Sequence, residues 1–153
     1  MNGRAAVAAG VAGSLAMDLV QDAFALAFER NRTEDDRDEE TEAIVAVVRR
    51  LSPFVPGDFV RKHPGTAGRV LHYAFGCGFA AAYAAARDRL PRIATGRGLA
   101  FGFGLWLLSD ALLIPAARLG RPWLRYSWAE RLNAVASHLA YAATVDAVLQ
   151  AAG

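Results

Sequence analysis

Four long apolar stretches divide the chain, and most charged residues lie between them. The stretches cover residues 5–28, 65–86, 98–117 and 128–150. Each is close to the roughly 20 residues that cross a hydrocarbon core about 30 Å thick. They are rich in alanine and leucine and lack the alternation of β-strands. The pattern therefore predicts an all-α protein, a single domain over residues 1–153 that forms an integral membrane four-helix bundle.

The ends of these stretches carry residues that are typical of helix boundaries. Pro64 precedes the second stretch and Pro91 follows it. Ser127-Trp128-Ala129-Glu130 predicts a capping box at the start of the fourth helix. Three aromatic residues lie beside that start, as in the aromatic belt of a membrane interface: Trp123, Tyr126 and Trp128.

The long segment between the first two helices differs from the rest of the chain. Residues 34–42 are strongly acidic, and apolar residues follow at helical spacing over residues 44–51, beside Arg49 and Arg50. This predicts a long acidic loop carrying a short amphipathic helix at the membrane surface. A solvated acidic loop with one ordinary helical turn is the alternative.

Two other interpretations of the apolar pattern stay open. Arg4, the apolar run after it and the small residues 25–27 also resemble a secretory signal peptide, although Asp18 and Asp22 interrupt the run. The charges within the helices would also suit a soluble helical bundle.

Composition excludes some classes of function. The net charge is +2, and no basic stripe with interleaved aromatic residues occurs, so a nucleic-acid partner is not expected. Cys77 is the single cysteine, which excludes an intrachain disulfide and a cysteine-based zinc site. Ser109-Asp110 has no positioned base and no phosphate-binding glycine loop follows a strand, so we do not expect an enzyme.

Polar residues inside the apolar stretches are the candidate functional residues. An ionisable side chain at the centre of a membrane costs about 2.5–3.5 kcal/mol on insertion scales, so it should face the bundle interior. If all four helices span and alternate in direction, five ionisable residues converge on the half next to the acidic loop, and Glu130 lies at the mouth on the same side. The predicted polar cluster is Asp18, Asp22, His72, Asp110, Glu130 and His138.

Three meanings of this cluster remain open. Hydrogen bonds between such side chains hold membrane helices together. Histidines titrate near neutral pH and buried carboxylates can be raised toward it, so a proton- or ion-responsive pocket is the second. The third is a metal or haem site with His72 and His138 as candidate ligands and an oxygen from Asp18 or Asp110. The sequence does not identify a cofactor.

Small residues predict close helix packing. Ala6, Gly10 and Ser14 follow the small-xxx-small spacing, as do Gly98 and Gly102. The contacts could form within the chain or between chains, so a homo-oligomer within the lipid bilayer is an open alternative.

The second helix resembles a known family. Residues 72–79, His-Tyr-Ala-Phe-Gly-Cys-Gly-Phe, followed by Tyr83, are similar to the second helix of the YagU-like inner-membrane proteins of bacteria. The glycine-rich start of the third helix and Ser137-His138 in the fourth add to the likeness. Asp110 stands where the family suggests histidine, and the long loop is acidic here. The resemblance implies a multi-pass inner-membrane protein linked to survival in acid.

The resulting functional hypothesis is a non-enzymatic membrane protein in acid or envelope stress response. The alternatives are a haem- or metal-binding redox protein that uses His72 and His138, and an accessory subunit of a larger membrane complex. The number of arginines in the loops on each side of the predicted helices favours a cytoplasmic position for the acidic loop. The family resemblance favours both termini in the cytoplasm, which we adopt.

Overall fold

The computed structural model describes residues 3–28, 62–116 and 123–153. These residues form an all-helical structure with no strand in the described ranges. The main helices are α1 (Gly3–Phe28), α4 (Pro64–Ala86), α5 (Leu99–Trp106) and α7 (Trp128–Ala151). The predicted all-α fold is confirmed, and the four predicted helices agree with the observed ones to within a few residues. The predicted acidic loop and its amphipathic helix lie outside the described residues.

The third helix is continuous but changes its winding. After α5 the chain forms a π-helix, η2 (Leu107–Leu113), and then a short α-helical turn, α6 (Ile114–Ala116). The hydroxyl of Ser109 lies 2.8 Å from the carbonyl oxygen of Leu105, where it competes with the backbone for that acceptor. Pro115 has no N–H to give, and the N–H of Ile114 donates to the carbonyl of Ser109. Such π turns recur at functional sites.

Two short 3-10 helices complete the described elements. They are η1 (Pro91–Ala94), between α4 and α5, and η3 (Trp123–Arg125), just before α7. Gly98 ends the turn before α5 with a positive φ of 85°, a conformation that favours glycine. The capping box predicted at Ser127 and Glu130 is confirmed as the start of α7.

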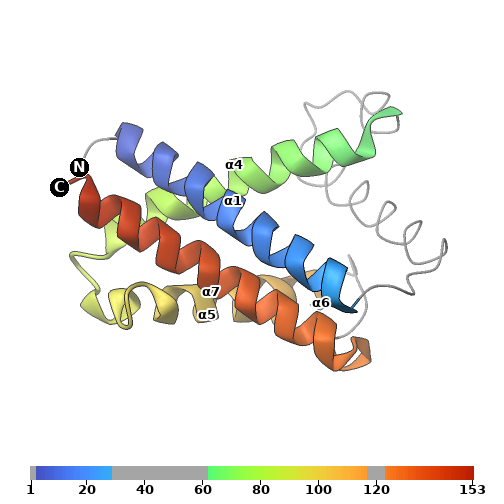
Figure 1. Cartoon of the computed structure of the whole chain (residues 1–153). Helices are drawn as coiled ribbons and strands as arrows, with labels where there is room; N and C mark the ends of the chain where they lie inside the picture. Colours follow the sequence, from blue (N-terminus) through green and yellow to red (C-terminus); the bar gives the residue numbers. More distant parts are fainter. Residues whose placement is uncertain (1–2, 29–61, 117–122) are drawn as a thin grey trace.

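The helices run in alternating directions (Figure 1). α1 and α5 begin at the end of the bundle where both chain termini lie, and α4 and α7 end there. We call this end the terminal end. α1 packs against both α4 and α7, and α5 packs against α7. α4 meets the third helix through Tyr83 and Phe101, whose ring centroids are 4.8 Å apart near the terminal end.

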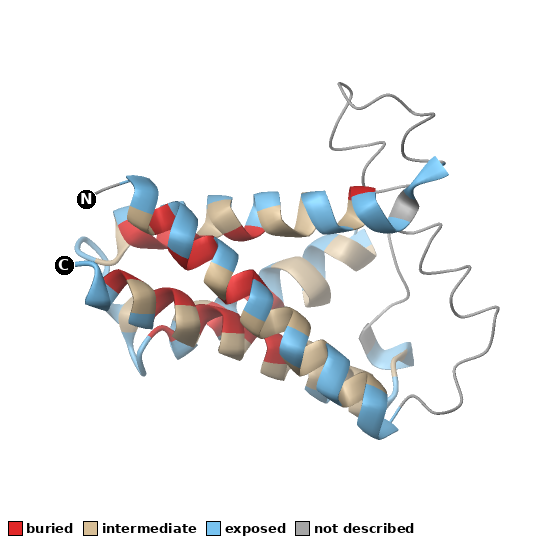
Figure 2. Ribbon diagram, turned by 45° about the horizontal axis from the view of Figure 1, so that its top comes forward, coloured by how far each residue is buried: buried red, intermediate tan, exposed pale blue. Residues whose placement is uncertain are grey.

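Small residues allow the helices to approach closely. A Cβ placed on Gly10 would lie 2.5 Å from the Cα of Cys77 on α4, and one on Gly102 would lie 2.7 Å from the carbonyl oxygen of His138. Both glycines belong to the predicted small-xxx-small stretches, which therefore pack within the chain. Most buried residues gather toward the terminal end (Figure 2).

Among the described helices, three are long and apolar enough to cross a membrane. They are α1, the continuous helix Leu99–Ala116 and α7. α4 has comparable length, with 23 residues, but is more polar. Many large apolar side chains of the described helices point outward, including Leu19, Leu26 and Val70. This is the surface expected of helices in contact with lipid.

Candidate functional site

Asp18 and His72 join α1 to α4, and we call them pair A. Nε2 of His72 lies 3.2 Å from Oδ1 of Asp18, an ion-pair distance whose orientation does not form a hydrogen bond. The hydroxyl of Tyr73 donates a hydrogen bond to Oδ2 of the same carboxylate at 2.8 Å. The side chains of His72 and Asp18 are 30% and 38% exposed. Pair A is therefore a half-buried ionisable site between two helices.

Asp110 and His138 join the third helix to α7, and we call them pair B. Nε2 of His138 lies 3.8 Å from Oδ1 of Asp110. Oγ of Ser109 lies 2.8 Å from this Oδ1 and 3.3 Å from Nε2 of His138. The side chain of His138 is 9% exposed and that of Asp110 is 25% exposed. Pair B is more enclosed than pair A. Asp110 lies inside η2, so the π winding sets the position of its carboxylate.

The second ring nitrogen of His138 fixes how this imidazole is protonated. Nδ1 lies 2.9 Å from the carbonyl oxygen of Ala134. A carbonyl only accepts, so in the neutral ring Nδ1 carries the hydrogen and Nε2 presents its lone pair to Ser109 and Asp110. Nε2 is therefore the ring nitrogen of the neutral form that has no hydrogen, and it lies on the side of Asp110.

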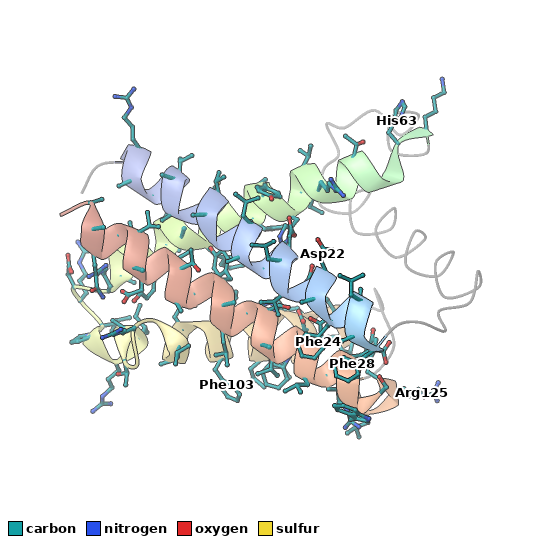
Figure 3. The ribbon with its side chains drawn as sticks, viewed as in Figure 1. Asp22, Phe24, Phe28, His63, Phe103 and Arg125 are labelled. Atoms are coloured by element: carbon teal, nitrogen blue, oxygen red, sulfur yellow. The ribbon has the colours of Figure 1, made fainter. Side chains whose placement is uncertain are left out.

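The other two residues of the predicted cluster do not join either pair. Oε2 of Glu130 accepts a hydrogen bond from the N–H of Ser127 at 2.7 Å, and Oγ of Ser127 accepts from the N–H of Glu130 at 3.2 Å. Asp22 is exposed on α1, one turn beyond Asp18, and contacts no other polar group of the described residues (Figure 3). The six predicted residues thus form two separate pairs, a helix cap and an exposed carboxylate.

A third ionisable site, absent from the sequence-based prediction, lies near the terminal end. The side chain of Asp146 on α7 is 1% exposed. Its Oδ1 accepts a hydrogen bond from the hydroxyl of Tyr83 at 2.7 Å and lies 3.6 Å from Nη1 of Arg87. The amide of Gln150 donates to Oδ2. Four side chains from α4, its C-terminal flank and α7 therefore meet in one buried network.

Aromatic side chains mark the opposite end of the bundle. The rings of Phe28 and Trp128 meet edge to face, with centroids 5.4 Å apart. The ring of Phe24 on α1 is tilted against that of Phe28, with centroids 5.5 Å apart (Figure 3). Trp128 is 62% exposed. It belongs to the predicted aromatic belt, and its position at a helix end suits a membrane interface.

The two candidate metal ligands belong to different pairs. His72 contacts Asp18, and both nitrogens of His138 already face oxygen atoms of its own surroundings. Within residues 3–28, 62–116 and 123–153, no three His, Cys, Asp or Glu side chains gather as a metal-binding group. The geometry therefore presents two carboxylate–imidazole pairs in place of one shared site.

The fold and these sites define a small helical protein of the membrane type, with ionisable side chains held between its helices. A family model described as a protein of unknown function (DUF1440) matches residues 59–147, more than half of the chain, and the chain belongs to this family. This is the YagU-like family, so the resemblance carried by the second, third and fourth helices is confirmed. The first helix lies outside the matched residues. Searches of curated proteins and of solved structures give no match.

Proposed function

We propose that this chain is a non-enzymatic, multi-pass protein of the bacterial inner membrane that takes up protons at pairs A and B when the pH falls, and that it acts in acid or envelope stress response. The observation that carries the proposal is the repeated contact of a histidine with an aspartate between helices, at 3.2 Å in pair A and 3.8 Å in pair B. Histidine is the side chain whose charge changes most readily between pH 5 and 8.

The surroundings of the pairs support a responsive site as well as a packing role. A purely structural role would favour polar groups that are fully enclosed. Both aspartates and His72 are instead partly exposed. This partial exposure supports proton uptake at the pairs. Protonation would convert a neutral imidazole beside a carboxylate into an ion pair between two helices, and so change the strength of their contact.

Substitution of the two histidines tests the proposal. His72→Gln and His138→Gln keep side chains of similar size that form hydrogen bonds but do not titrate. We expect each variant to reach the membrane in normal amounts and to lose the protection that the intact protein gives to bacterial cells in acid. His63→Gln is the matched control, because His63 is exposed at the start of α4 and belongs to neither pair.

Normal acid survival of both histidine variants would overturn the proposal. A second measurement tests the rival redox function on the same preparation. We expect detergent-purified protein to show no haem absorption band and no stoichiometric metal. A Soret band that disappears in either histidine variant would replace proton uptake with haem ligation.

A further inference from the structure

The first and third helices bury the same positions in the same order. The buried residues of α1 are matched by buried or partly buried residues each 92 positions further along the chain. The matched pairs are Ala6 with Gly98, Ala9 with Phe101, Gly10 with Gly102, Gly13 with Leu105 and Ser14 with Trp106. The residues between them, such as Val7 and Leu99, are exposed in both helices.

The second and fourth helices agree in the same manner. Residues of α4 are matched by residues of α7 that lie 66 positions further along the chain. The matched pairs are His72 with His138, Gly76 with Ala142, Ala80 with Asp146 and Tyr83 with Leu149. All of these except His72 are buried. Amphipathic helices in general bury positions three or four apart, so spacing alone has little weight. More weight belongs to the matched histidines and to three matched pairs of small residues, Ala6 with Gly98, Gly10 with Gly102 and Gly76 with Ala142; the other five pairs differ in residue type.

The contacts within each pair of helices also correspond. Gly10 packs against Gly76 and Cys77, and Gly102 packs against His138 and Ala142. In each case an aspartate follows the glycine by eight residues, a little over two helical turns, and meets the histidine of the second helix. The same small-residue crossing is thus followed by the same carboxylate–imidazole contact.

The direction of the chain is consistent with a repeat. α1 and α5 both run away from the terminal end, and α4 and α7 both return to it (Figure 1). We infer that the chain consists of two equivalent helical hairpins, hairpin A (α1 with α4) and hairpin B (Leu99–Ala116 with α7), and that pairs A and B are one proton-binding site present twice. The hairpin equivalence stands on geometry; the shared proton-binding role rests on the proposed function.

The equivalence also explains which polar groups are not duplicated. Asp146 corresponds to Ala80, so its network with Tyr83 and Arg87 belongs to one hairpin alone. Tyr73, which donates to pair A, corresponds to Leu139, and in pair B Ser109 supplies the hydroxyl instead. The common element is therefore the aspartate and the histidine.

Few other charges face the two pairs. The ionisable groups of the described helices in this half of the bundle are Asp18 and Asp22 on α1, Arg69, His72 and Tyr73 on α4, Asp110 on η2, and Glu130, Arg131 and His138 on α7. Glu130 is engaged by the helix cap. Each histidine thus has one aspartate as its nearest ionic partner.

Histidine-ring NMR of the full chain in detergent micelles tests the shared role. We expect the ring signals of His72 and of His138 each to change on acidification. Asp18→Asn should alter the pH response of the His72 ring signals and leave that of His138 unchanged. Asp110→Asn should do the reverse. A histidine that does not titrate, or that ignores its own aspartate, would overturn the equivalence of the two sites.

Disulfide trapping tests the hairpin equivalence without reference to protons. Sγ of Cys77 lies 3.7 Å from the carbonyl oxygen of Val7, so Val7→Cys should cross-link hairpin A. The corresponding pair in hairpin B is Leu99→Cys with Ala143→Cys, made in Cys77→Ala. Leu99→Cys with Ala136→Cys is the control, about 10 Å out of register.

The two experiments fail in different ways. Cross-linking in both hairpins and none in the control supports the repeat. Cross-linking in hairpin A alone would overturn it. Cross-linking in both hairpins without paired titration would keep the repeat and remove the shared proton-binding role, together with the proposed function.

Discussion

Removal of the Asp146 carboxylate is the substitution we expect to destabilise the bundle most clearly. This side chain is 1% exposed and binds the hydroxyl of Tyr83 at 2.7 Å and the amide of Gln150. Arg87 lies 3.6 Å away. Asp146→Ala would leave the buried hydroxyl of Tyr83 and the exposed amide of Gln150 without their acceptor near the terminal end of the bundle. The network joins α4 to α7, which also meet where the hydroxyl of Tyr141 donates to the carbonyl oxygen of Gly76.

The magnitude follows from how far each partner is buried. An unsatisfied buried donor costs about 1–3 kcal/mol, and Tyr83 is fully buried. Arg87 contributes less, because its side chain is 24% exposed and its Nε lies 4.0 Å from Asp88. A fully buried broken ion pair costs about 3–5 kcal/mol, and the partial exposure of Arg87 places this case at the lower limit. We expect a loss of about 3 kcal/mol for Asp146→Ala.

Asp146→Asn separates the hydrogen bonds from the charge. The amide oxygen can still accept from Tyr83, and Gln150 can turn its own oxygen toward the new amide. Only the attraction to Arg87 and the strengthening of two hydrogen bonds by charge are lost. We expect a loss of about 1 kcal/mol, distinctly smaller than for alanine.

Unfolding in detergent micelles with increasing SDS, followed by far-UV circular dichroism, measures both losses. Asp22→Ala and Asp22→Asn are the matched controls, because Asp22 is an exposed aspartate with no polar contact among the described residues. They should leave the unfolding midpoint unchanged. The reasoning fails if Asp146→Ala unfolds with the wild type, or if asparagine is as damaging as alanine.

Two further predictions concern helix packing and capping. Gly102→Ala should lower stability by about 1–3 kcal/mol in the same SDS titration, because its Cβ would lie 2.7 Å from the carbonyl oxygen of His138. Gly104→Ala, with no atom within 4 Å of its Cβ, should not; equal losses would contradict close packing as the cause. Ser127→Ala should cost about 1 kcal/mol and speed amide exchange at Glu130, whereas Ser127→Asp should preserve both, and unchanged exchange in Ser127→Ala would refute the cap.

Local signals in the sequence determine most of the fold. The apolar stretch 128–150 and the residues before it predicted α7, and the observed helix begins at Trp128 behind the predicted capping box. Both features depend on neighbours within a few residues, so no knowledge of tertiary contacts was needed. Gly10 and Gly102 were also predicted to lie at close helix contacts, but which helix each one meets came only from the structure.

The π-helix shows where local signals are too weak. Ser109 and Pro115 each disturb the hydrogen bonding of a helix, yet in most helices such residues produce a bend or a simple interruption. The sequence-based prediction therefore placed Asp110 by the uniform rise of an α-helix, about 1.5 Å per residue, an assumption that η2 breaks.

Asp146 was missed because the predicted cluster lies in the half of the bundle next to the acidic loop, whereas Asp146 lies near the terminal end. On α7 it also lies about 80° beyond His138 at 100° per residue, away from the side of Glu130. The observed α7 packs against α1 on one side and α5 on the other, so its buried surface covers about half of the circumference. A helix between two neighbours can bury polar groups on two faces, and Asp146 lies on the second.

The same arrangement explains why the predicted cluster separates into pairs. The six residues were placed by depth, and depth agrees for Asp18 with His72 and for Asp110 with His138. Depth does not specify which neighbouring helix a side chain faces. α1 packs against both α4 and α7, and Asp18 contacts His72 of α4, whereas Asp110 contacts His138 of α7. If each hairpin is one copy of a repeated unit, the separation into two pairs follows directly. One central site would have required the histidines to face each other, whereas a repeated hairpin places one site in each copy.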